Sequence, residues 1–411
     1  MQSTEETPST FEGLGINNLF MEVLAKYKFV VPTPIQRKAM PVANAGEDVI
    51  GIAQTGTGKT LAFGIPMLQR LHGGEAQGIG LVLLPTRELA MQVDETLGRI
   101  GGNMGLRTAV LIGGESMRKQ VMQLRKRPHV IVATPGRLLD LVEQGQVKLD
   151  KTGILVLDEA DRMLDMGFAP QLNRIMKMLP DANVRQTLLF SATMPSDIVT
   201  IANTHMRTPV RVEVAPQGTS AETVEQELYI VRKEDKFALL LDILRQYNGP
   251  ILVFSRTKHG ATKLTKHLID EGHKVAEIHS NKSLVQRIRA LEGFKKGVYR
   301  VLVATDIAAR GIDVTGIELV INFDLPDNSG DYVHRIGRTG RAGRAGRAIS
   351  FAMPDQRTDI RDIERLIRKP LTITKHAKLS VELPSIPAAQ RGFMGGRRRS
   401  YPRRPRFGGR R

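Results

Sequence analysis

The feature that most constrains the fold is the octapeptide at residues 53–60, which reads Ala-Gln-Thr-Gly-Thr-Gly-Lys-Thr. The apolar run 49–52 precedes it and a helical pattern follows over residues 61–71, so the order is strand, glycine-bearing loop, helix. Such a loop points backbone N–H groups inward at the positive end of a helix dipole and suits phosphate. The octapeptide matches G-x-x-x-x-G-K-[ST] except at Ala53, where the pattern has glycine. Taken alone, it could also be a glycine-containing turn before an ordinary helix.

Individual residues of this loop suit separate parts of a nucleotide. Gly56 and Gly58 allow the backbone to approach phosphates at points where a Cβ atom would collide. Lys59 can reach the β- and γ-phosphates, and the hydroxyl of Thr60 can ligate Mg²⁺. The sequence therefore predicts a nucleotide site at the end of an early strand.

Composition and charge predict a multidomain protein with a polyanionic partner. The length of 411 residues favours two or three domains, and the net charge of +18 favours nucleic acid. Half of that charge lies in residues 391–411, which contain nine arginines and no acid. The chain has no cysteine, which excludes disulfides and favours the cytoplasm. No apolar run approaches the ~18 residues that cross a bilayer, so we expect no membrane association.

Strand-like and helical patterns alternate in two blocks, which predicts two doubly wound α/β domains. Strands of the first block are expected at 49–52, 80–84, 107–112, 129–133, 154–157, 186–190 and 210–213. Strands of the second are expected at 227–231, 251–254, 275–278, 300–304, 318–322 and 347–352, before a last helix at about 356–368. The predicted divisions are a disordered segment 1–10, a domain 11–213, a linker 214–222, a domain 223–370 and a disordered basic tail 371–411.

An acidic segment follows the predicted strand 154–157 and reads Asp-Glu-Ala-Asp at residues 158–161. In α/β sheets ligands bind at the carboxyl ends of strands, which is where this segment lies. Asp158 is suited to holding Mg²⁺ there, and Glu159 to deprotonating an attacking water. An acidic surface turn is a poor alternative, because the carboxylates would repel one another without a cation nearby.

Together, the phosphate loop and the Asp-Glu-Ala-Asp segment resemble the DEAD-box ATP-dependent RNA helicases of helicase superfamily 2, over about residues 11–370. The resemblance implies two tandem RecA-like parallel-sheet domains, ATP and Mg²⁺ as cofactors, and RNA-stimulated ATP hydrolysis that opens short RNA duplexes. The core and the Arg/Gly-rich tail look most like the bacterial RhlE-type branch. Implied partners are single-stranded and short duplex RNA, together with ribosome-assembly or RNA-decay proteins, and we expect a monomer.

The resemblance implies an ATP site built by both domains. Gln36 and Phe11 would contact adenine, which fits the pairing of glutamine with adenine N6 and N7 and the stacking of aromatic rings on bases. A glutamine after Pro-Thr-Pro could equally be a plain helix start. Lys28 stands where the family usually has glycine. The implied ATP-binding residues are Phe11, Gln36, Gln54, Thr55, Gly56, Thr57, Gly58, Lys59, Thr60 and Asp313, the last at the ribose.

Catalysis is implied for Lys59, Asp158, Glu159, Arg338 and Arg341, with Thr60 and Asp158 as the metal ligands. Arg338 and Arg341 belong to the sequence His-Arg-Ile-Gly-Arg-Thr-Gly-Arg and would act as arginine fingers on the γ-phosphate. Such fingers are worth about 10³–10⁵ in rate in phosphoryl transfer. The alternative for this stretch is a solvated basic helix end.

The resemblance assigns the remaining motifs to RNA binding and to the coupling of ATP hydrolysis to duplex opening. The implied RNA contacts are Arg87, Gly114, Thr134, Arg137, Arg256 and Thr305, and each taken singly could be a helix cap or turn residue. The implied coupling residues are Asp161, Ser191, Thr193 and His334. The hydroxyls of Ser191 and Thr193 could instead cap the helix after Pro195.

Two other functions fit parts of the sequence. An ATP-gated RNA clamp would bind both ligands without much unwinding, but the presence of Glu159 and Arg338 favours turnover. A DNA helicase of the same superfamily would show no dependence on the RNA 2′-OH.

Overall fold

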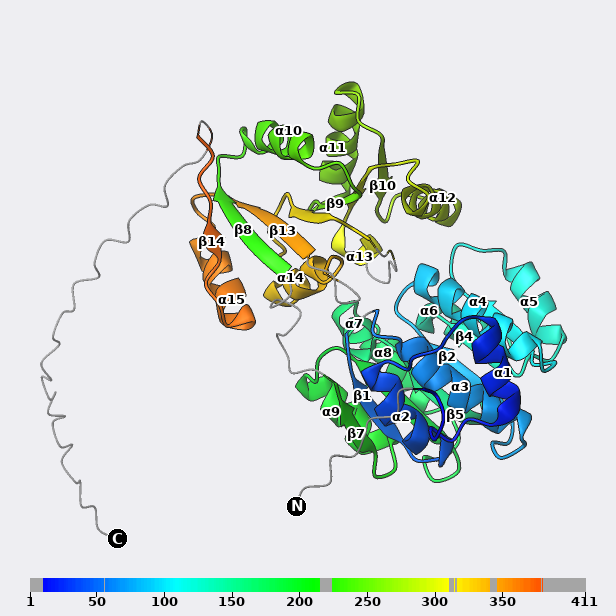
Figure 1. Cartoon of the computed structure of the whole chain (residues 1–411). Coiled ribbons are helices and arrows are strands. Elements are labelled where there is room, and N and C mark those ends of the chain that lie inside the picture. Colours follow the sequence, from blue (N-terminus) through cyan, green and yellow to red (C-terminus); the bar gives the residue numbers. More distant parts are fainter. Residues whose placement is uncertain are drawn as a thin grey trace, which may run out of the picture.

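The computed structural model describes residues 10–54, 56–214, 224–309, 314, 316–340, 346–377 and 379. It contains two α/β lobes, each built on a seven-stranded sheet whose strand pairs are all parallel (Figure 1). The strand order is β3-β4-β2-β5-β6-β1-β7 in the first lobe and β10-β11-β9-β12-β13-β8-β14 in the second. The predicted fold of two tandem parallel-sheet domains is confirmed.

The first lobe alternates strands and helices as its sequence predicts. Its strands are β1 (Val49–Ile52), β2 (Ile79–Leu83), β3 (Thr108–Leu111), β4 (Val130–Ala133), β5 (Thr152–Leu157), β6 (Gln186–Ser191) and β7 (Val210–Glu213). Its helices are α1 (Asn18–Lys26), α2 (Pro34–Asn44), α3 (Lys59–His72), α4 (Arg87–Gly102), α5 (Met117–Arg125), α6 (Pro135–Glu143), α7 (Ala160–Asp165), α8 (Ala169–Met176) and α9 (Ser196–His205).

The second lobe repeats the pattern. Its strands are β8 (Val224–Ile230), β9 (Ile251–Phe254), β10 (Val275–Ile278), β11 (Val301–Ala304), β12 (Leu319–Asn322), β13 (Gly346–Ala352) and β14 (Thr372–Ile373). Its helices are α10 (Lys236–Gln246), α11 (Lys258–Asp270), α12 (Leu284–Lys295), α13 (Asp306–Ala309), α14 (Ser329–Ile336) and α15 (Arg357–Ile367).

Both faces of each sheet are buried under helices, which explains why the strands read as continuous apolar runs. Val156 of β5 packs in one apolar cluster, whereas its neighbours Leu155 and Leu157 pack in the cluster on the opposite face. Helices α1 to α4 complete the first cluster, and α6 to α9 complete the second. In the second lobe α10 and α11 cover one face, while α12, α14 and α15 cover the other. None of the helices in the described ranges is long and apolar enough to cross a bilayer.

One strand lies outside what the sequence predicted, and the predicted terminal and linker segments lie mostly outside what the structure describes. Strand β14 was not expected; it pairs in parallel with β8 within the segment predicted as tail. The predicted disorder of the N-terminus, the linker and the tail falls mostly on residues outside the described ranges, and so stays a prediction.

Lys28 ends helix α1 in a left-handed backbone conformation, with φ of 61°. The N–H of Phe29 donates to the carbonyl of Leu24 and that of Lys28 to Ala25, each at 2.9 Å. These are the two hydrogen bonds of a Schellman motif, whose left-handed position favours glycine. The turn therefore keeps the geometry that glycine would adopt, at the cost of a strained lysine.

We expect Lys28→Gly to raise the free energy of unfolding of the first lobe by about 1 kcal/mol, because glycine adopts positive φ without the Cβ clash. Ala25→Gly, at an exposed position inside the same helix, is the matched control and should lower it by about 1 kcal/mol. Urea-induced unfolding followed by circular dichroism would measure both changes. A destabilising Lys28→Gly substitution would contradict the strain at this turn.

Candidate functional site

The phosphate loop lies between the end of β1 and the start of α3. Gly56 and Gly58 both have positive φ, of 84° and 89°, and Lys59 is the first residue of α3. The hydroxyl of Thr57 donates to the carbonyl of Gln54 at 2.7 Å and holds the turn closed. The loop therefore presents its backbone at the N-terminus of a helix, as a phosphate cradle requires. The predicted contact Thr55 lies outside the described residues.

Gln36 joins helix α2 to the phosphate loop. Its side-chain oxygen accepts from the N–H of Thr33 at 2.9 Å, which forms a capping box at the start of α2. Its amide nitrogen donates to the carbonyl of Gly58, also at 2.9 Å. A Cβ atom on Gly58 would lie 2.4 Å from that nitrogen, so this glycine is required for the approach. Phe11 is 3% exposed and packs in the first-lobe core; adenine contact by Gln36 and Phe11 stays a prediction.

Lys59 and Asp158 form a buried charged pair beside the phosphate loop. The Lys59 ammonium lies 3.6 Å from a carboxylate oxygen of Asp158, and it has no hydrogen-bond acceptor within the described part of the chain. Burial raises the pKa of Asp158 to about 6; Lys59 opposes this rise and Glu159 adds to it. A buried lysine that lacks an acceptor suits a phosphate, and a carboxylate beside it suits Mg²⁺. With Thr60 half-buried in the first turn of α3, these residues fit Mg·ATP.

Glu159 lies at a strained point between β5 and α7. Its φ of 52° places a non-glycine residue in the left-handed region, and strain of this kind gathers at active sites. The backbone N–H of Glu159 donates to the Asp158 carboxylate at 2.9 Å. The Glu159 carboxylate lies 3.8 Å from Nε of Arg162, and both side chains are buried. Asp158 and Glu159 therefore share one hydrogen-bonded turn at the carboxyl end of β5.

The predicted coupling residues of the first lobe are in direct contact. One oxygen of Asp161 accepts from both the backbone N–H and the hydroxyl of Thr193, each at 2.9 Å. The Ser191 hydroxyl accepts from the Asp161 N–H at 3.3 Å. Helix α9 begins after Pro195 without a side-chain cap, so the structure rejects the alternative in which Ser191 and Thr193 cap it. These hydroxyls instead join the end of β6 to the acidic segment.

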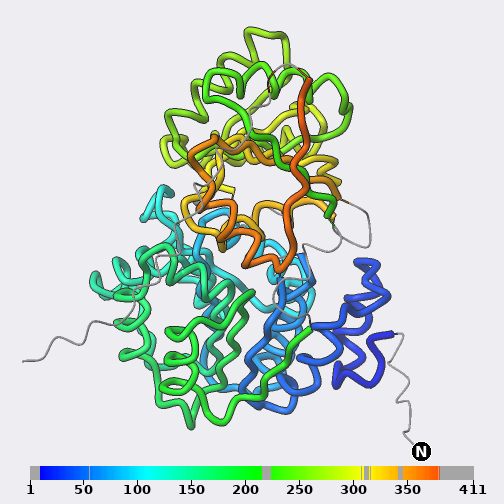
Figure 2. The backbone as a smooth tube through the Cα atoms, turned by 90° about the vertical axis from the view of Figure 1, so that its left-hand side faces the viewer, coloured from blue at the N-terminus to red at the C-terminus, as the bar shows by residue number. Residues whose placement is uncertain are grey.

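A cavity of about 610 Å³ is lined by residues of both lobes. The first lobe contributes Gln54, Asp161 and Thr193 to its wall. The second contributes His334 on α14 and Arg338 just beyond the helix, and Arg338 is only 3% exposed. Figure 2 shows α15, in orange, on the side of the second lobe that faces the first. The structure thus brings Arg338 to the cavity, while Asp313 and Arg341 lie outside the described residues.

The predicted RNA contacts of the first lobe gather at one edge of its sheet. Arg87, Gly114 and Thr134 follow strands β2, β3 and β4, which are neighbours. A Cβ atom on Gly114 would lie within 2.3 Å of the Arg87 guanidinium, so the two are packed together. Arg137 donates to the carbonyl of Glu115 at 3.2 Å. These residues lie after the carboxyl ends of neighbouring strands, where an arginine, a backbone amide and a hydroxyl suit a phosphate backbone.

In the second lobe, Arg256 and Thr305 follow neighbouring strands, β9 and β11. The Arg256 guanidinium lies 3.2 Å from the carboxylate of Asp327 and donates to the carbonyl of Leu325 at 3.3 Å. Thr305 is half-buried directly after β11. Both residues are placed at the carboxyl edge of the second sheet.

An ion pair joins the lobes beside this edge, and its pairing was not predicted from the sequence. Arg287 on α12 donates to Glu88 on α4 at 2.8 Å, with 12% and 5% of their side chains exposed. Leu284, in the first turn of α12, packs against the core cluster of the first lobe. Glu88 directly follows Arg87, but no spacing in the sequence indicates a partner 199 positions away.

Each of the two lobes matches a known protein family. A family model for DEAD/DEAH box helicases matches residues 33–201, and a model for the helicase conserved C-terminal domain matches residues 235–343. The ATP-dependent rRNA helicase RRP3 of Yarrowia lipolytica is 42% identical over 340 residues, covering 82% of this chain and 70% of that protein. The ATP-dependent RNA helicase RhlB of Pseudomonas aeruginosa is 41% identical over 383 residues, covering 90% of this chain and 96% of that protein. The structure of S. cerevisiae Dbp5 bound to RNA and ADP-BeF3 has a TM-score of 0.80 at 31% identity, covering 89% of this chain and 96% of that one.

Proposed function

Because this chain belongs to the DEAD-box family of ATP-dependent RNA helicases, we propose that its two lobes share one ATP site, which RNA completes by drawing them together. The protein is an ATP-dependent RNA helicase that uses ATP and Mg²⁺. Our proposal assigns a role in ATP binding or hydrolysis to individual residues of each lobe.

The first lobe holds the nucleotide and its metal in this proposal. Lys59 binds the β- and γ-phosphates, Thr60 and Asp158 hold Mg²⁺, and Glu159 takes the proton of the attacking water. Mg²⁺ held by Thr60 and Asp158 would neutralise charge that develops on the phosphates. Gln36 contacts adenine from α2 while it holds the loop through Gly58.

In this proposal the second lobe supplies the arginine fingers and the ribose contact, which the first lobe does not have. Arg338 and Arg341 face the γ-phosphate, and Asp313 contacts the ribose. The cavity carries this proposal, because Arg338 and the pair Asp161–Thr193 line its two sides. Charge that develops on the transferred phosphoryl group is then met by a guanidinium from the opposite lobe.

The proposal is tested by ATP hydrolysis and strand separation on a short duplex of about ten base pairs, with matched RNA and DNA strands. We expect RNA, and not DNA of the same sequence, to stimulate hydrolysis and to be opened in the presence of ATP. Tight ATP-dependent RNA binding without turnover would instead support the clamp.

We also propose that residues 391–411 supply non-specific RNA affinity and no catalysis. Truncation after Gln390 removes nine arginines, so it should weaken RNA binding and leave the saturating kcat unchanged. The slope of log affinity against log salt should become shallower by about 0.7 for each RNA phosphate that the tail neutralises in the full chain. Binding titrations between low and physiological salt give this slope. The same slope in the truncated and full chains would contradict the proposal.

The cellular setting is proposed from the relatives and the tail. An rRNA helicase is among the similar proteins, which supports a role beside ribosome-assembly proteins, with RNA decay as the second setting. The compact core and the Arg/Gly-rich tail support the RhlE-type branch. We propose that the protein acts in the cytoplasm as a monomer.

A further inference from the structure

Arg335 is a buried cation to which neither the nucleotide nor the RNA motifs assign a role. It lies on α14, one turn before Arg338, and is 1% exposed. A buried guanidinium lowers the stability of the fold unless its donors are satisfied. Even when they are, replacing a buried ion pair by apolar residues of similar size often leaves the stability unchanged or raises it. Its presence in the core of the second lobe therefore calls for a reason other than stability.

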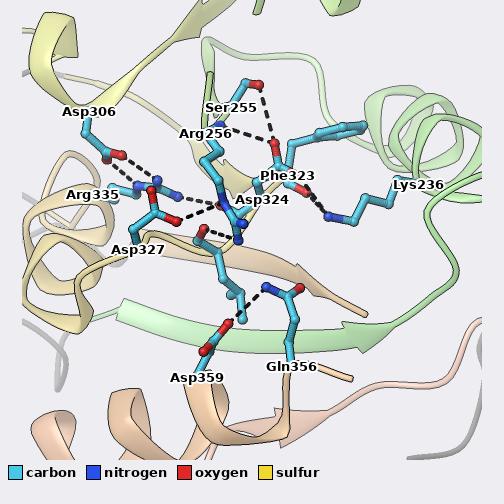
Figure 3. A network of polar contacts seen from close by, with 11 residues as sticks. Lys236, Ser255, Arg256, Asp306, Phe323, Asp324, Asp327, Arg335, Gln356 and Asp359 are labelled. Carbon is cyan, nitrogen blue, oxygen red and sulfur yellow. Dashed lines mark hydrogen bonds and ion pairs between the residues drawn. The ribbon is translucent and has the colours of Figure 1, made fainter. Parts of the chain in front are cut away.

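The contacts of Arg335 join three strand ends to the helix that precedes Arg338. Its Nε and Nη2 atoms donate to the two carboxylate oxygens of Asp306, at 2.5 and 2.7 Å (Figure 3). Nη1 donates to the side chain of Asn322 at 3.1 Å and to the carbonyl of Asp324 at 2.6 Å. The guanidinium also lies 5.0 Å from the ring centroid of Phe254. Paired bonds to a carboxylate set the orientation of an arginine as well as its distance.

Two of these partners belong to segments proposed to contact RNA. Asp306 directly follows Thr305 at the end of β11, and begins α13. The Asp324 carboxylate accepts from the backbone N–H of Arg256 at 3.1 Å and from Lys236 at 2.9 Å (Figure 3). Movement of either RNA-contacting segment would therefore act on Arg335, directly through Asp306 or through the backbone of Asp324.

On its other side, the backbone carbonyl of Arg335 accepts from the N–H of Arg338 at 3.1 Å. Helix α14 ends at Ile336, and Nε of Arg338 donates to the carbonyl of His334 at 3.3 Å. The direction of the Arg338 guanidinium thus depends on where the last turn of α14 lies. Stabilisation of a transition state requires donors that are placed before the reaction begins.

We propose that Arg335 is a positioning residue, which sets the place of Arg338 at the ATP site according to the state of the RNA-contacting segments that hold Asp306 and Asp324. The inference rests on the proposed function of Arg338 and Thr305. Arg335 does not touch the nucleotide in this scheme. It acts through α14, and its loss uncouples RNA binding from hydrolysis.

The test is Arg335→Lys in the full chain, since lysine keeps the charge and loses the paired bonds to Asp306. We expect the RNA-stimulated kcat to fall at least tenfold, while the dissociation constants for Mg·ATP and RNA change less than twofold. Arg300→Lys is the matched control: Arg300 precedes β11 at its opposite end, where it donates to the carbonyls of Leu244 and Tyr247. This control should keep its kcat within twofold of the parent. A purely structural role would instead lower the melting temperature and the fraction of active protein, and leave kcat per active molecule unchanged.

Asp306→Asn serves as the second variant if Arg335→Lys does not fold, because it keeps the shape of the pair and removes one charge. Its stimulated kcat should fall severalfold, again with nearly normal ligand affinities. The double variant Arg335→Lys/Arg338→Ala should be no slower than Arg338→Ala alone, because one residue acts through the other. A parent-like kcat in a folded Arg335→Lys or Asp306→Asn protein, or additive losses in the double variant, would overturn the inference. A parent-like Arg338→Ala protein would overturn the proposed function itself.

Discussion

Glu159→Gln is expected to lower RNA-stimulated ATP turnover by about two to four orders of magnitude, the usual contribution of a general base. The substitution keeps the size of the side chain and the left-handed backbone turn that Glu159 occupies. It removes the ability to accept a proton from the attacking water, together with the negative charge that faces Arg162 at 3.8 Å. Binding of Mg·ATP and of RNA should stay within a few-fold of the parent, because Asp158 and Lys59 are intact. Single-turnover hydrolysis with saturating RNA measures the chemical step directly.

Asp158→Asn provides the contrast to that variant. It removes the proposed metal ligand, which should weaken Mg·ATP binding as well as turnover, whereas Glu159→Gln should spare binding. Glu143→Gln, on the exposed face of α6, is the neutral control. Hydrolysis by Glu159→Gln at the parent rate in the presence of RNA would show that another group is the base.

The second large effect is expected from Arg338→Ala, which should reduce the stimulated kcat by about 10³–10⁵ while ATP still binds. We expect this loss because the cavity is lined by both lobes. Lys59 and the other groups proposed to bind the ATP phosphates lie in the first lobe, and Arg338 reaches the cavity from the second. Residues 1–215 alone should likewise bind Mg·ATP and hydrolyse it negligibly, with no rescue by RNA. ATP affinity and RNA-stimulated hydrolysis are measured for both proteins.

Arg365→Ala tests whether Arg338 acts through its position as an arginine finger or only through its positive charge. Arg365 lines the same cavity, but its side chain is 80% exposed and pairs with Asp362 at 3.0 Å. It should therefore change turnover less than twofold, since exposed ion pairs are weak. Normal RNA stimulation in residues 1–215 would show that the site is not shared between the lobes.

Local sequence determined the elements that carry the proposed nucleotide site. The strand before the phosphate loop and the strand before Asp158 were both predicted, because strands buried on both faces leave long apolar runs in the sequence. The glycines at 56 and 58 were predicted as well, since few residues tolerate their backbone geometry. Each of these signals lies within a few residues of the feature it predicts.

Other residues had two interpretations in the sequence. Gln36 read equally as a helix start and as a nucleotide contact; it lies in the first turn of α2, its amide reaches Gly58, and its contact with adenine stays a prediction. Ser191 and Thr193 could have capped α9, but they bond to Asp161 instead. The partners Gly58 and Asp161 are distant in sequence from these residues, so local patterns carry no information about the contacts.

The tertiary structure alone decided the contacts that join distant segments. Glu88 and Arg287 meet across the lobes, and Arg335 reaches Asp306 and Asp324 because parallel strands bring their carboxyl ends together. Strand β14 has only two residues, both exposed, so it has no alternation to recognise and forms because β8 offers an edge. The sequence by itself indicated which residues are candidates to bind phosphate, metal and RNA. Chain packing decided which of them meet, because a hydrogen bond or ion pair between distant residues depends on the placement of whole sheets rather than on local backbone preference.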